Sequence, residues 1–91
     1  MDEGTQFLVT ELEHLMSLPL DSKAERDAWY VESKTVQKAL RERFANLEYP
    51  HDLWHFLADA DIRARDPGYR KYQEQMVTDY ITKAKSEHQT R

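Results

Sequence analysis

Three residues capable of binding a metal ion recur every four positions in one segment of the chain. His51, His55 and Asp59 would share one side of a helix, because a helix has about 3.6 residues per turn. Two histidines at this spacing can bind one divalent ion, and a carboxylate one turn further on could join them. Three collinear ligands rarely all reach one ion, so we favour the alternative, a solvated face on which His55 pairs with Asp59.

Carboxylates and arginines alternate just after these histidines. Asp59 and Asp61 could do acid–base chemistry if both were buried, but on a helix their side chains diverge by about 200°. We therefore expect ion pairs within the helix, Asp59 with Arg63 and Asp61 with Arg65. No serine lies in a nucleophile motif, and two glycines cannot form a phosphate-binding loop. We predict no catalytic residue and no cofactor.

The same segment carries two apolar faces. Trp54, Ala58 and Ile62 form a stripe about 140–160° away from the main apolar face. The main apolar face consists of Leu53, Phe56, Leu57, Ala60 and Ala64. Between the two apolar faces lies a narrow polar wedge, formed by Asp52, Asp59 and Arg63. Either this is the central helix of the domain, or the stripe binds a partner protein with His51, His55 and Arg65 at its edge.

The first apolar segment is wider than a surface helix requires. Its apolar side chains cover an arc of about 200°, whereas a helix on a protein surface needs roughly 100°. Such a helix must be covered from two sides, and the rest of the chain offers limited cover. We therefore predict self-association, most simply a homodimer, through Phe7, Val9, Met16 and Leu18.

Helical periodicity and breaking residues predict the elements that position these side chains. Four helices are expected, over about residues 5–18, 22–46, 50–65 and 66–85, with short connections. Thr5 is expected to cap the first, a Ser22–Glu25 capping box starts the second, and Asp66 with Pro67 starts the last. The pattern predicts an all-α bundle, a single domain over residues 1–91 with frayed ends at 1–4 and 86–91.

The last expected helix is rich in aromatic residues and poor in aliphatic ones. Its inward face should carry Tyr69, Gln73, Met76, Tyr80 and Ala84, with Tyr72 and Val77 at the borders. We therefore expect this helix at the periphery of the core.

Composition narrows the class of protein. The chain has 91 residues, of which 40% are hydrophobic and 33% charged, and it contains no cysteine. This length suits one domain, and the lack of cysteine excludes disulfides and thiolate metal sites. The apolar runs are far shorter than the roughly 20 residues of a membrane span, and the acidic N-terminus is unlike a secretory signal. We predict a soluble, cytoplasmic protein.

Charge is distributed unevenly along the chain. Residues 1–20 contain four acids and no Lys or Arg, whereas residues 67–91 contain five bases and three acids. The two ends could therefore lie side by side. A DNA-binding helix-turn-helix is disfavoured, because Asp52, Asp59 and Asp61 on its recognition helix would repel phosphates.

These observations favour a non-catalytic protein–protein interaction or regulatory module that acts through its helix faces. The first alternative is a metal-binding protein or small metal-dependent enzyme that uses the His51, His55 and Asp59 cluster. The second is a nucleic-acid-binding regulator.

Overall fold

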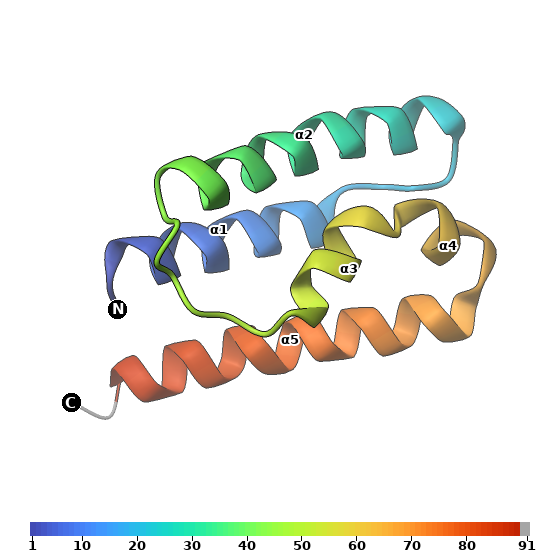
Figure 1. Cartoon of the computed structure of the whole chain (residues 1–91). Coiled ribbons are helices and arrows are strands. Elements are labelled where there is room, and N and C mark those ends of the chain that lie inside the picture. The colour runs from blue at the N-terminus through green and yellow to red at the C-terminus, as the bar shows by residue number, and fades with distance from the viewer. Residues whose placement is uncertain (90–91) are drawn as a thin grey trace.

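Most helices of the structure begin close to the positions that the sequence predicts. The structure, a computed structural model, describes residues 1–89 in backbone and 1–87 with side chains, and its described part forms five helices and no strand (Figure 1). The all-α prediction is confirmed. The helices are α1 (Glu3–Ser17), α2 (Lys23–Glu42), α3 (Asp52–Ala58), α4 (Ala60–Arg65) and α5 (Pro67–Gln89).

The first two helices begin at side-chain caps. Asp2 Oδ1 accepts the Thr5 backbone N–H at 2.7 Å, so α1 starts before the Thr5 cap that the sequence predicts. At α2 the predicted capping box is present: Glu25 N–H donates to Ser22 Oγ at 3.1 Å, and Ser22 N–H donates to Glu25 Oε1 at 2.9 Å. Residues 86–89 continue α5, and residues 90–91 lie outside the described part.

The wide apolar arc of α1 is covered by the chain itself. α1 packs between α2 and α5, and Leu8, Val9 and Leu12 are fully buried. The Trp29 indole N–H of α2 donates to the Leu15 carbonyl of α1 at 2.9 Å, so this buried aromatic ring has its polar atom satisfied. The remaining cover comes from α5.

The buried face of α5 is rotated from the predicted one. Gln73, Val77 and Ile81 are buried, although the sequence placed Val77 at a border. Met76 and Tyr80, predicted to face inward, are only half-buried. Packing against α1, α3 and α4 selects the face that carries the branched aliphatic residues.

The expected helix 50–65 is not continuous. It begins at Asp52 and breaks at Asp59 (φ −113°, ψ 26°) into α3 and α4. The preceding connection is also longer than predicted, because α2 ends at Glu42 and residues 43–51 cross from α2 toward α5 outside any helix (Figure 1). α3 and α4 therefore occupy one half of the fourth position of the bundle, and this segment crosses the other half without forming a helix.

The acidic start of the chain does lie against its basic end. Lys85 Nζ of α5 contacts Glu13 Oε2 of α1 at 2.9 Å. Within residues 1–89, no helix combines the length and the apolarity needed to cross a membrane.

Candidate functional site

The three metal-ligand candidates do not converge. The His51 and His55 rings are exposed and meet edge to face, with centroids 5.4 Å apart. Asp59 lies beyond the helix break, and its Oδ2 accepts the Tyr69 hydroxyl at 2.6 Å. Among the described residues no three His, Cys, Asp or Glu side chains are grouped so as to hold a metal ion. The break after Ala58 is the physical reason, because it ends the regular four-residue spacing.

The break itself is held by side chains that cap the last turn of α3. A helix end leaves its final carbonyls without partners in the helix. Three side chains from other positions donate to them: Arg63 Nη1 to Phe56 O (2.7 Å), Ser33 Oγ to Leu57 O (2.7 Å) and the Tyr30 hydroxyl to Ala58 O (3.1 Å). The Tyr30 hydroxyl also accepts the Asp61 backbone N–H at 3.1 Å. One phenol therefore bridges the two helices.

Arg63 is buried, contrary to the exposed polar wedge predicted from the sequence. Its residue is 2% exposed, and its guanidinium carbon lies 4.7 Å from the Trp29 ring centroid and 4.1 Å from that of Phe56. Nη1 also donates to Gln73 Oε1 at 2.6 Å. Desolvation lowers the pKa of Arg63 to about 10, so the group stays charged at neutral pH. Cation–π contacts and neutral acceptors stabilise this charge.

The predicted ion pairs within the helix are wrong, because both carboxylates contact other helices. Asp59 lies at the break and bonds to Tyr69 and Gln73 of α5. Asp61 Oδ1 lies 3.8 Å from Arg26 Nε of α2. Gln73 Nε2 donates to the Tyr69 hydroxyl at 2.8 Å, which closes the polar cluster around α4. This cluster joins α4 to α2 and α5.

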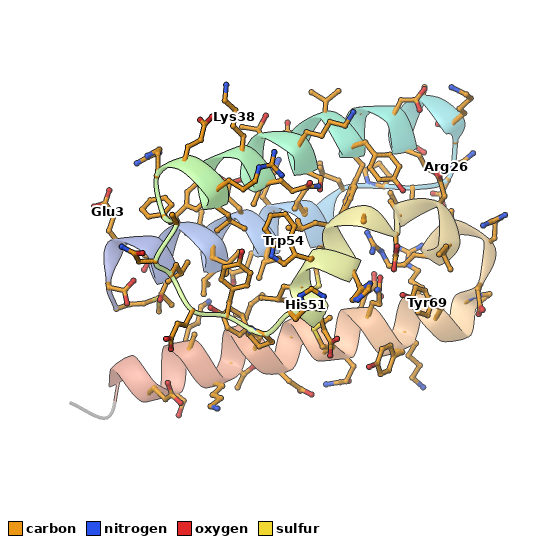
Figure 2. The ribbon with its side chains drawn as sticks, in the orientation of Figure 1. Glu3, Arg26, Lys38, His51, Trp54 and Tyr69 are labelled. Carbon is orange, nitrogen blue, oxygen red and sulfur yellow. The ribbon has the colours of Figure 1, made fainter. Side chains whose placement is uncertain are left out.

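The second apolar stripe is divided between two helices. Trp54 on α3 is half-buried, packs against the core and lies beside Tyr49, with ring centroids 6.2 Å apart. Ile62 on α4 is 39% exposed, and Ala58 is exposed at the end of α3. The predicted edge residues His51, His55 and Arg65 are all exposed. Figure 2 shows Trp54 and His51 projecting from the region of α3, whereas Tyr69 lies at the start of α5.

The predicted self-association residues are mostly used within the chain. Val9 is fully buried and cannot form an exposed contact surface. Phe7 packs against Phe44, with ring centroids 5.1 Å apart, and Met16 and Leu18 are half-buried against the core. The helix is covered because residues 43–51 and α5 supply the cover that the sequence did not reveal.

A groove of about 850 Å³ lies between the start of α1, the end of the segment 43–51 and the second half of α5. We call it the α1–α5 groove. Its floor is made of half-buried apolar side chains that pack against the core: Met1, Tyr49, Met76, Tyr80 and Ala84. Met76, Tyr80 and Ala84 follow one another at four-residue spacing, so they lie on successive turns of α5. The sequence predicts that these three residues share one face of a helix. It does not predict that the start of α1 and the segment 43–51 form the other two walls.

The rim of the groove is charged. Four carboxylates line it, from Asp2, Glu48, Asp79 and Glu87. Lys83 also lines the groove, and its Nζ lies 3.8 Å from Glu87 Oε1. Burial, together with the charges of Asp2 and Glu87, raises the pKa of the Tyr80 hydroxyl. Most of the charged side chains that line the groove are therefore negative.

The short helix α3 explains why the groove exists. The described part of α5 has 23 residues, whereas α3 has seven. Figure 1 shows the second half of α5 extending past α3, accompanied there by α1 and the segment 43–51. Gly4 lets this segment approach α1, since a Cβ at Gly4 would lie 3.2 Å from carbons of Phe44 and Leu47. The missing half-helix of the bundle leaves apolar side chains of α5 incompletely covered.

Comparison with known proteins finds no matching family model, no matching curated protein and no matching solved structure.

Proposed function

We propose that this protein is a non-catalytic protein-interaction module that binds a short helix of a partner protein in the α1–α5 groove. The observation that supports this proposal is the apolar floor, which lies where a four-helix bundle would carry the other half of its fourth helix. A partner helix bound there would complete the bundle. It would bury the exposed parts of Met76 and Tyr80, residue types that are common in protein interfaces.

The groove suits a helix of limited length. Its α5 wall runs from Met76 to Glu87, which corresponds to about three turns or roughly 16 Å. An amphipathic helix of about 12 residues would match this length and present apolar side chains at i, i+3, i+4 and i+7. Binding of this kind requires no reactive group, in agreement with the non-catalytic role that the sequence favours.

Charge argues against nucleic acid as the occupant. Phosphates drive most of the binding energy of nucleic-acid complexes, and they require Lys or Arg side chains at the contact surface. The groove instead carries four carboxylates. A partner helix is therefore the better match.

The test is a selection of helical peptides on the full-length protein. A display library of about 12-residue peptides carries leucine at i, i+3, i+4 and i+7, and the remaining positions are randomised. Binders are then measured by fluorescence anisotropy against the native protein, Ala84→Glu and Thr82→Glu. Ala84 lies on the groove floor, whereas Thr82 is exposed on α5 and does not line the groove.

We expect selected peptides to lose at least about 10-fold in affinity with Ala84→Glu, because a carboxylate would be buried against the apolar face of the peptide. Thr82→Glu adds the same charge to the same helix and should leave binding unchanged. Peptides that bind both variants equally, or a selection that yields no binder, would contradict the proposal. Circular dichroism of both variants confirms that they are folded.

A further inference from the structure

We infer that the partner helix is basic: Lys and Arg residues beside its apolar face meet the carboxylates of Asp2, Glu48, Asp79 and Glu87 at the rim of the α1–α5 groove. This inference rests on the proposed function and specifies the chemistry of the partner.

The charge balance of the groove supports a cationic occupant. Against its four carboxylates stand Lys83 and the α-amino group of Met1, so the lining remains net negative. Lys83 is already within 3.8 Å of Glu87. Asp79 and Glu48 are exposed and come from different walls, α5 and the segment 43–51, and Asp79 Oδ1 accepts a hydrogen bond from Gln75 Nε2 at 2.9 Å. A helix between these walls would place basic side chains on both of its flanks within reach of a carboxylate.

The direction of the Tyr80 pKa shift agrees with the acidic lining of the groove. Its pKa is raised by burial first and then by the charges of Asp2 and Glu87. A field that disfavours a phenolate at this position also favours a cation nearby. Because the same carboxylates surround the floor, basic residues of a bound helix would gain from the field that disfavours the phenolate.

Other occupants fit this charge less well. The chain itself has a formal net charge of −4, so a second copy would bring like charges to the acidic rim. An anionic lipid surface would be repelled in the same way. A basic amphipathic helix satisfies both the apolar floor and the rim.

The experiment compares two double variants that lose the same charge. Glu48→Gln/Asp79→Asn neutralises one carboxylate of the segment 43–51 and one of α5. It leaves Asp2, which caps α1, unchanged. The control Asp27→Asn/Glu32→Gln neutralises two exposed carboxylates of α2 that do not line the groove. Both are titrated with the groove-dependent peptides selected above, and Kd is measured at about 0.05 M and about 0.5 M salt.

We expect the selected peptides to be enriched in Lys and Arg at their randomised positions. Their Kd should rise about 3- to 10-fold in the groove variant and remain unchanged in the control, as two exposed ion pairs would produce. High salt should remove most of this difference. Groove-dependent peptides without a charge preference, or equal effects of the two double variants, would overturn the inference and leave the proposed function standing. No groove-dependent peptide at all would overturn both.

Discussion

At the scale of single residues, Arg63 is the least expected feature of the molecule. It is one of three buried polar side chains in the described part of the chain, with Ser33 and Gln73. Two of them donate to the last carbonyls of α3, and Gln73 accepts from Arg63. Its second terminal nitrogen, Nη2, has no hydrogen-bond partner within the described residues. Arg63 therefore combines a desolvation cost with four compensating contacts: two aromatic faces, the Phe56 carbonyl and the Gln73 side chain.

Replacing Arg63 should separate these contributions. Arg63→Ala leaves the Phe56 carbonyl and Gln73 Oε1 without their donor and opens a cavity beside Trp29, so the free energy of unfolding should fall by about 3–5 kcal/mol. Arg63→Met fills much of the cavity and should recover about 1–2 kcal/mol of that loss. Urea unfolding measures both variants. The exposed Arg65→Ala serves as control, and a loss for Arg63→Ala no larger than that of the control would contradict this role.

Tyr69 should make stability sensitive to alkaline pH. The hydrogen bond to Asp59, followed by burial, raises the pKa of Tyr69 from 10.0 to about 12. In the unfolded chain the phenol ionises near pH 10, but in the folded protein it holds its proton to higher pH. The stabilising contribution is therefore complete below pH 10 and is lost as pH rises toward about 12.

The measurement compares native protein with Tyr69→Phe by urea unfolding at several alkaline pH values. The native protein should lose stability more steeply between pH 10 and about 12, because only it contains the Tyr69 phenol, whereas the other tyrosines titrate in both proteins. The pKa of Arg63 is lowered, so its effect on stability at alkaline pH has the opposite sign, and this effect is present in both proteins. Parallel curves for the two proteins would show that the Tyr69–Asp59 bond is not maintained in solution.

At the scale of elements, the break between α3 and α4 determines the shape of the bundle. No proline or glycine causes it, since residues 52–65 contain neither. Instead, side chains of α2 and α4 supply the hydrogen bonds that a continuous helix would have made within itself. The α1–α5 groove lies at the other end of α3, because the lining residues Glu48, Tyr49 and Pro50 precede this helix.

The bridging hydroxyl of Tyr30 should contribute measurably to this break. Tyr30→Phe removes one donor to Ala58 O and one acceptor for Asp61 N–H but preserves the aromatic contact with Trp29. Both bonds are exposed, so water replaces them in part and we expect a loss of about 0.5–1.5 kcal/mol in urea unfolding. Tyr72→Phe, at a site that is 60% exposed, is the matched control and should have no effect. Equal stability of the two variants would mean that the hydroxyl does not stabilise the break.

At the scale of the whole molecule, the fold is stabilised by a core shared among α1, α2 and α5, to which α3 and α4 add one side. Apolar side chains of all five helices or their flanks meet there, including Leu12, Trp29, Phe56, Ala60 and Val77. Ion pairs such as Lys85–Glu13 join helix surfaces but are exposed, so each adds little. The energy of folding therefore comes from burial and helix caps.

The fold should not depend on a metal ion. The exposed His51 and His55 rings meet edge to face, and the Asp59 carboxylate is bound to Tyr69 of α5. A strong chelator should consequently leave the thermal unfolding midpoint unchanged, because the described residues contain no metal-ligand cluster that could contribute folding energy. Differential scanning calorimetry with and without chelator measures this. A fall of more than about 4 °C, roughly 1 kcal/mol for a domain of this size, would contradict it.

Local patterns in the chain were sufficient to predict an all-α fold and the capping box at Ser22 and Glu25. These features depend on neighbours within one or two helical turns, which the sequence displays directly. Three-dimensional packing was required for the break at Asp59, the burial of Arg63 and the rotated face of α5. Each depends on partners far away along the chain, such as Tyr30, which bonds to Ala58 from 28 residues away. The α1–α5 groove also depends on tertiary packing. Its walls come from three segments that are far apart in the sequence, and one of them, residues 43–51, is not helical.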